Sequence, residues 1–190
     1  MKTRCPWLNL KNKQYIDYHD NEWGVPVYDD DKLFACLTLE GAQAGLSWET
    51  ILKKRQNYFE QFNGLLIDSM ANVSDTFLEN ALTNPGIVRN RLKVFSIRKN
   101  AIGIKKIQAE FGSFSSFLWS KVGGSPKIHY FENLGDYISS DELSNNVSKE
   151  LKSYGMSFVG PTITYAFFQA VGIYDDHSTN CSFKSNGRIE

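Results

Sequence analysis

Apolar residues recur every three or four positions along most of the chain, a spacing that predicts amphipathic helices. In the first long one, Leu33, Leu37 and Ala44 share a face. Gly45 predicts the left-handed residue that ends this helix, and Ser47 predicts the N-cap of the next. The pattern predicts helices over about 32–44 and 47–62, after Ser74, after Gly86, over about 113–122, after a capping box at 139–142, and over 162–171.

These helices indicate an all-α fold, because no stretch alternates like a half-buried strand and no βαβ unit or internal repeat occurs. The chain has 190 residues, of which 42% are hydrophobic, and this fits one compact domain, residues 1–190, with two helical lobes. No run approaches the roughly 18 apolar residues of a membrane span. We therefore expect a cytoplasmic monomer without a membrane partner.

Glu40 falls on the same helix face as Leu33 and Leu37, where side chains should be dry. Burying an unpaired carboxylate is costly or raises its pKa strongly. Two interpretations remain open on spacing alone. Either Glu40 lies at the edge of the face and reaches solvent or an arginine, or it lies in a dry site and has a purpose there.

Four aromatic residues crowd the first 25 positions without a helical or strand period: Trp7, Tyr15, Tyr18 and Trp23. The absence of a period predicts irregular structure packed onto the body of the protein. Aromatic side chains usually belong to the core. Four of them with polar handles also suit a stacking pocket.

Basic residues gather in one part of a chain whose net charge is zero. Between positions 80 and 109 there are seven Lys and Arg and no Asp or Glu, beginning with Arg89, Arg91 and Lys93. They follow a Pro-Gly turn at Gly86, and a tight turn that opens a helix presents N–H groups suited to a phosphate. The turn reads as an ordinary helical hairpin or, with the basic helix, as a contact to a DNA backbone.

Three cysteines, an odd number, argue against a disulfide scaffold. Cys36 fits as a buried filler on the first long helix. Two Cys and two His at the ends of the chain suit one closed, structural zinc site that would join the termini: Cys5, His19, His177 and Cys181. Chance placement near the chain ends is the alternative.

Several long stretches resemble the DNA-3-methyladenine glycosylase I family, a branch of the helix-hairpin-helix DNA glycosylases. The resemblance extends through almost the whole chain. It rests on Tyr18-His19-Asp20-Asn21-Glu22-Trp23-Gly24, Leu39-Glu40-Gly41, Gln43-Ala44-Gly45-Leu46-Ser47-Trp48, Lys53-Lys54-Arg55, Gly86-Ile87, Phe158-Val159-Gly160 and the final His-x3-Cys.

The resemblance implies a compact helix-hairpin-helix glycosylase fold with both termini held by one structural Zn²⁺ on the four residues above. It implies that Glu40, Tyr18 and Trp48 contact the excised base, and that Trp7, Tyr15 and Trp23 line the pocket. Gly45 and Leu46 correspond to the turn that fills the gap left in the duplex. The turn at Gly86, with Arg89, Arg91 and Lys93 after it, corresponds to the DNA-binding hairpin.

The implied function is a monofunctional hydrolase that extrudes 3-methyladenine from alkylated double-stranded DNA and leaves an abasic site. Glu40 is the expected catalytic residue, because a carboxylate suits the cationic base and accepts from its amine. No Asp occurs between Asp75 and Asp136, where many relatives in the superfamily place one. Two alternatives remain: a DNA-binding module that senses alkylated bases without excising them, and an enzyme in which zinc activates water.

Overall fold

The computed structural model describes residues 2–185. The chain in this part is mainly helical. Its helices are, in chain order, α1 Lys13–Asn21, α2 Asp30–Gln43, α3 Trp48–Gln61, the 3₁₀ turn η1 Asn63–Leu65, α4 Ile67–Ala71, α5 Asp75–Ala81, α6 Arg91–Phe111, α7 Phe114–Ser120, the 3₁₀ turn η2 Leu134–Asp136, α8 Glu142–Ser153 and α9 Pro161–Ala170. Two short strands, β1 Lys127–Ile128 and β2 Tyr174–Asp175, pair in parallel.

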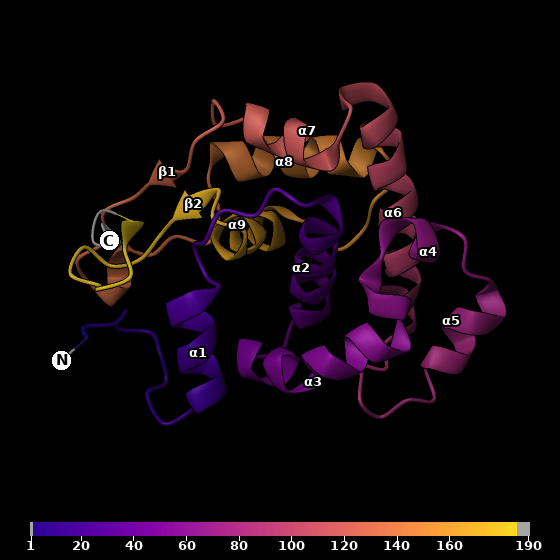
Figure 1. The fold of residues 1–190 in the computed structure, drawn as a ribbon, viewed down its shortest axis with the longest axis horizontal. Coiled ribbons are helices and arrows are strands. Elements are labelled where there is room, and N and C mark those ends of the chain that lie inside the picture. Colours follow the sequence, from indigo (N-terminus) through magenta and orange to yellow (C-terminus); the bar gives the residue numbers. More distant parts are fainter. Residues whose placement is uncertain (1, 186–190) are drawn as a thin grey trace.

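Helix α2 lies at the centre of the molecule (Figure 1), with α3, α6, α7 and α9 packed around it. Leu33 and Leu37 are fully buried, as their spacing predicts. Helices α1 and α3 lie on one side of α2 in this view, α7 and α8 on the opposite side, and α4 to α6 at one end. Because α3, α4, α6, α7 and α9 all contact α2, its position is fixed from several directions.

Helix boundaries follow the local signals read from the sequence. Ser47 caps α3 by accepting from the N–H of Thr50 at 3.2 Å, and Ser74 caps α5 in the same way. Gly45 has a φ of +78°, the left-handed conformation expected just beyond α2. Pro161 begins α9, where its missing N–H costs nothing.

Three expectations about local structure need correction. The segment with the N-terminal aromatics is not wholly irregular, because α1 carries Tyr15 and Tyr18. The capping box before α8 is formed by Asp141 and Ser144, not by Ser139 and Glu142. The chain also contains the two-residue strands β1 and β2, which are too short to show an alternating pattern.

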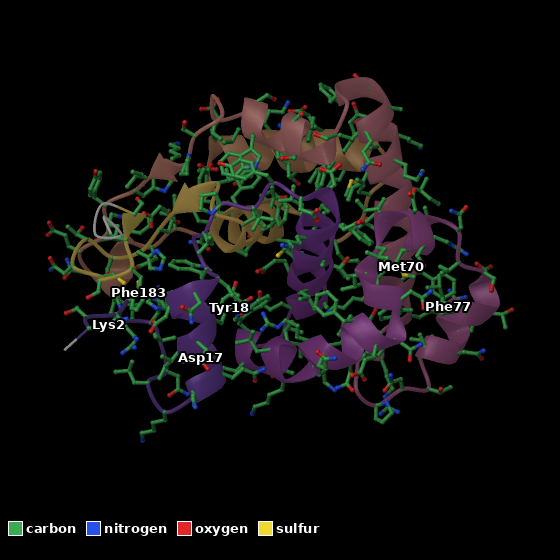
Figure 2. All side chains as sticks on the ribbon, viewed as in Figure 1. Lys2, Asp17, Tyr18, Met70, Phe77 and Phe183 are labelled. Atoms are coloured by element: carbon green, nitrogen blue, oxygen red, sulfur yellow. The ribbon has the colours of Figure 1, made fainter. Side chains whose placement is uncertain are left out.

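The two ends of the described chain meet at one end of the molecule. Figure 2 shows Lys2 and Phe183 there, with the Lys2 ammonium 5.0 Å from the centre of the Phe183 ring. The N–H of Ser182 donates to the carbonyl of Thr3 at 2.9 Å, so the two segments also pair through their main chains. No helix within residues 2–185 is both long and apolar enough to cross a membrane.

Candidate functional site

A cavity of about 280 Å³ opens between α1, α2, α3, α9 and the loop around η2. It is small for a ligand pocket and is walled largely by aromatic rings. All six residues predicted to meet or surround the base line it. The lining residues are Trp7, Tyr15, Tyr18, Trp23, Glu40, Gln43, Trp48, Leu134, Tyr137, Ile138, Ala166 and Gln169.

The aromatic rings support one another in tilted and edge-on contacts. The ring centres of Tyr18 and Trp48 are 5.2 Å apart, and those of Trp7 and Trp23 are 4.8 Å apart. Burial raises the pKa of Tyr18 well above its ordinary value, so its hydroxyl stays protonated and able to donate. The rings present a rigid, electron-rich wall that attracts a flat cation.

Glu40 lies in this cavity with only 4% of its surface exposed. Its carboxylate accepts no hydrogen bond and forms no ion pair within residues 2–185. Burial raises its pKa to about 8. Of the two interpretations open from the sequence, the edge of the face with a solvent or arginine contact is therefore wrong. The carboxylate is available to a ligand donor.

Leu46 lies on the turn between α2 and α3 and is 41% exposed despite its apolar side chain. The carbonyls that precede it are held by Lys93, whose ammonium donates to Ala42 at 2.9 Å and to Ala44 at 2.6 Å. Both carbonyls lie at the C-terminal end of α2, where the last carbonyl groups of a helix have no N–H partner within the helix.

The sequence predicted that Lys93 contacts DNA, but in the structure its ammonium contacts the end of α2. Its side chain is buried, and burial lowers its pKa. The expected phosphate contact is corrected to a cap on α2 that fixes the turn before Gly45 and Leu46. Spacing on a basic helix could not show this, because the two carbonyls come from a segment about 50 positions away in the chain.

The turn at Gly86 fits closely against α3. A Cβ at Gly86 would approach Cγ of Asn57 to 2.6 Å, so only glycine fits there. The N–H of Gly86 donates to the Asn84 side chain at 2.8 Å, and that of Val88 donates to the Tyr58 hydroxyl at 3.2 Å. Gly86 thus contributes shape, since its own N–H is already used.

The N-terminus of α6 lies directly after this turn. Arg89 and Arg91 are both exposed, and the Arg91 guanidinium stacks 4.1 Å from the Phe95 ring. Acidic residues of α4 and α5 pair with part of the basic run, the pairs being Lys105–Asp68, Arg98–Asp75 and Arg91–Glu79. The one-sign charge of the sequence is therefore partly neutralised in the folded chain.

Three of the four expected zinc ligands form one group: Cys5, His19 and Cys181. The Cys181 sulfur lies 3.7 Å from Nε2 of His19. A tetrahedral zinc holds a thiolate sulfur and an imidazole nitrogen about 3.6 Å apart, so the spacing suits it. Hydrogen bonds from Cys181 and the N–H of Ser178 lower the pKa of Cys5, and the same contact between the two thiols raises the pKa of Cys181 to about 12.

His177 lies beside this group, with its ring centre 5.0 Å from that of His19, but it is not part of the set. Its Nδ1 pairs with Asp175 at 2.9 Å, and Nδ1 of His19 pairs with Asp20 at 2.8 Å. Carboxylates orient metal-bound histidines in this way. Nε2 of His177 is buried and has no hydrogen-bond partner in the part of the chain that the structure describes, so it offers a fourth ligand atom beside the group.

Sequence reasoning missed part of the cavity wall. Leu134, Tyr137 and Ile138 come from the loop after β1, and Ala166 and Gln169 come from α9. The spacing of three between the last two residues places them on one face, but that face looked like ordinary core in an apolar helix. The loop carries no periodic signal, so only the folded chain reveals its position.

We expect Lys93→Met to destabilise the protein by about 1–3 kcal/mol, because it keeps the buried stem and leaves two carbonyls unsatisfied. Urea unfolding measures the effect. Lys99→Met, on the exposed side of α6, is the matched control and should change stability by less than about 0.5 kcal/mol. Equal effects of the two substitutions would show that the cap contributes nothing.

Glu40→Gln is expected to stabilise the protein at high pH. The pKa of Glu40 rises from 4.5 to about 8 on folding, so stability present below pH 4.5 is lost as the pH approaches 8. Glutamine does not titrate. The difference in the free energy of unfolding between Glu40→Gln and the wild type should therefore grow with pH by about 1.4 kcal/mol per pH unit, to at most about 5 kcal/mol. Urea unfolding at pH 5, 7 and 9 tests this, and a constant difference contradicts it.

Comparison with known proteins places the chain among glycosylases. The sequence model of the methyladenine glycosylase family matches residues 7–185. A DNA-3-methyladenine glycosylase of Haemophilus influenzae is 40% identical over 186 residues, which are 98% of this chain and 100% of that protein. DNA-3-methyladenine glycosylase 1 of Escherichia coli is 41% identical over 181 residues, 94% of this chain and 95% of that protein.

Solved structures agree with these matches. A crystal structure of a 3-methyladenine DNA glycosylase I variant in complex with 3-methyladenine aligns with a TM-score of 0.90 at 41% identity, covering 92% of this chain and 94% of that chain. The Staphylococcus aureus enzyme, solved to explain recognition of 3-methyladenine, gives 0.89 at 42% identity and covers 92% of this chain and 93% of that chain. The chain belongs to the methyladenine glycosylase family.

Proposed function

We propose that this protein is a monofunctional DNA glycosylase that extrudes 3-methyladenine from alkylated double-stranded DNA and hydrolyses its N-glycosidic bond, leaving an abasic site for base excision repair. The observation that carries the proposal is Glu40, a buried carboxylate that lines an aromatic cavity and has no hydrogen-bond or ion-pair partner among residues 2–185. The named activities of relatives at about 40% identity point to the same substrate.

Alkylation at N3 gives adenine a positive charge, and the cavity suits that charge in two ways. The faces of Tyr18 and Trp48 attract a flat cation, and the Glu40 carboxylate lines the cavity with no competing hydrogen bond from the described residues. Burial raises the pKa of Glu40 to about 8, so the ionised form of Glu40 is costly in the free protein. A cationic base beside the carboxylate stabilises that ionised form, whereas a neutral adenine does not. Selection of the damaged base then follows from charge.

The turn that carries Gly45 and Leu46 is the proposed plug for the space left in the duplex. Extrusion of a nucleotide costs a few kcal/mol of stacking and pairing. An exposed leucine on a turn held by Lys93 offsets part of that cost by filling the gap without moving. The hairpin at Gly86, with Arg89 and Arg91 beside the start of α6, is the proposed contact to the DNA backbone.

Hydrolysis in this proposal depends on an electrostatically prepared, partly dry site. Glu40 stabilises charge on the leaving base, and water attacks the sugar carbon. A lyase would need a free amine near the sugar, but the ammonium of Lys93, the first lysine after the hairpin, is held by two carbonyls outside the cavity. This supports a monofunctional hydrolase.

We also propose that Cys5, His19, His177 and Cys181 hold one structural Zn²⁺. The spacing of three of them and the free Nε2 of His177 support this set. The rings of Trp7 and Trp23 pack against His19 and His177, between the ligand group and the cavity they line. Four protein ligands leave no place for a reacting water, so the metal would hold the aromatic wall and α1 in place.

Residues 1–190 are proposed to act as one glycosylase domain and as a monomer in the cytoplasm, where damaged DNA is its substrate. One contiguous core connects residues of α2 through α9, and a smaller cluster beneath the cavity joins Cys5, Tyr18, Trp23, Leu52 and Cys181. The second cluster contains residues from both ends of the chain. The two ends of the chain therefore fold together as part of one domain in this proposal.

The function is tested by release of free 3-methyladenine from methylated duplex DNA, resolved by chromatography. We expect Glu40→Gln to lower the excision rate about 10- to 100-fold with DNA affinity unchanged, because glutamine keeps an acceptor oxygen but removes the negative charge that faces the cationic base. Glu142→Gln, on the exposed start of α8, is the control and should match the wild type. Wild-type protein that binds DNA and releases no base would instead be a sensor of alkylation.

The metal is tested by elemental analysis and thermal unfolding. Cys181→Ser should lower the zinc content from about one per chain to near zero and cost at least about 3 kcal/mol, a fall in Tm of about 6–12 °C for a chain of this size. Cys36→Ser, outside the ligand group, should keep its zinc. Equal metal content in the two variants would exclude this site.

A further inference from the structure

Gln169 is a polar residue of the cavity wall that the proposed function does not use. It lies on α9, and its main-chain carbonyl accepts from the N–H of Gly24 at 3.0 Å. Its side-chain Nε2 donates to Oδ2 of Asp176 at 2.7 Å. Both its main chain and its side chain are therefore anchored.

Asp176 is a fully buried carboxylate that forms hydrogen bonds with three side chains, one of which is Gln169. Its Oδ2 also accepts from the hydroxyl of Tyr165 at 2.7 Å, and its Oδ1 lies 2.7 Å from Nδ1 of His129. An ionised carboxylate accepts hydrogen bonds and donates none. The amide of Gln169 must therefore turn its NH₂ group toward Asp176, which settles the orientation that an amide otherwise leaves ambiguous.

The amide oxygen Oε1 of Gln169 is left for the cavity. It accepts no hydrogen bond within residues 2–185. Among the described residues, the polar side-chain atoms that are fully enclosed and have no hydrogen-bond partner belong to Thr38, Trp48, Tyr137 and His177. Oε1 of Gln169 is not one of them, so it has no partner among these residues but is not fully enclosed. Because Gln169 lines the cavity and its Oε1 is not enclosed, this oxygen is an acceptor open to a bound base.

The exocyclic amine of an adenine carries two N–H donors, and a buried donor without a partner costs about 1–3 kcal/mol. Glu40 accepts one of them in the proposed function, on which this inference rests. We infer that Gln169 is a specificity-determining residue: its fixed carbonyl oxygen accepts the second N–H of the 6-amino group. A 6-oxo purine would place an oxygen against this oxygen, and the anchored amide could not turn to donate.

Charge and exocyclic group are thus read by different residues. Glu40 favours a cationic base over a neutral one. Gln169 is neutral and cannot make that distinction, but it separates 6-amino from 6-oxo purines, since a site built to receive a donor rejects an analogue without it. 3-Methylguanine, which is alkylated at the same position and carries a 6-oxo group, is the purine that Gln169 would reject.

The test compares release of 3-methyladenine and 3-methylguanine from the same methylated duplex by wild type, Gln169→Met and Tyr165→Phe. Methionine keeps the length of the side chain and removes the acceptor. Tyr165→Phe is the matched control, because it also removes one hydrogen bond to Oδ2 of Asp176 and leaves the Gln169 amide in place. Binding of free 3-methyladenine, followed by tryptophan fluorescence, is measured in parallel.

We expect Gln169→Met to weaken binding of free 3-methyladenine and to slow its release about tenfold. Release of 3-methylguanine should stay the same or rise, so the ratio of the two falls about tenfold. Tyr165→Phe should leave the ratio unchanged. If Gln169→Met leaves the ratio of 3-methyladenine to 3-methylguanine release unchanged, the inference is overturned. If in addition both bases are released more slowly while binding of free 3-methyladenine is unchanged, Gln169 would act on the attacking water instead.

These results are separable from the proposed function. Wild-type protein that releases no base contradicts the glycosylase, whereas the fluorescence titration still tests Gln169. Equal affinity of wild type and Gln169→Met for the free base would then overturn the inference as well. Wild-type release that survives in Gln169→Met with the same base preference overturns the inference alone.

Discussion

The carboxyl group of Glu40 is buried in the cavity wall without a hydrogen-bond partner in the described part of the chain, and burial raises its pKa to about 8. Helix α2 cannot turn Glu40 toward solvent, because Leu33 and Leu37 on the same helix are fully buried. The protein therefore keeps a destabilised acid in an aromatic cavity. The binding of a cation with N–H donors relieves this destabilisation, so the same feature that weakens the free protein favours its proposed ligand.

The remaining elements hold that cavity in shape from three directions. Lys93 fixes the end of α2 and the turn that carries Leu46. Asp176 fixes Gln169 on α9, and the group around Cys5 and Cys181 holds both ends of the chain against the aromatic wall. The contacts of Lys93 and those of the group around Cys5 and Cys181 join segments distant in sequence, whereas Asp176 and Gln169 are seven positions apart. Preorganisation of this kind lets the site bind an extruded base without paying to order its own side chains.

Local signals predicted most of the helices because the energies involved are local. Ser47 and Gly45 act within a few residues of their own positions. Spacing placed Glu40 on the same helix face as Leu33 and Leu37 but did not decide whether its carboxylate is buried. The helix α1 was missed because Trp7 and Trp23 lie outside it and obscure the spacing of three that places Tyr15 and Tyr18 on one helix face. Lys93 was assigned to DNA for a similar reason: spacing shows which helix carries a charge, not what that charge contacts.

The sequence by itself determined the all-α class, the caps and the family resemblance, since these depend on residue type and short-range spacing. The resemblance in turn implied six of the residues that line the cavity. The tertiary structure decided which polar atoms are already used. It showed that the Lys93 ammonium is bound by two carbonyls about 50 positions away, whereas the Glu40 carboxylate and Oε1 of Gln169 have no hydrogen-bond partner within residues 2–185. Hydrogen-bond partners distant in the chain are set by packing, and packing leaves no periodic trace in a sequence.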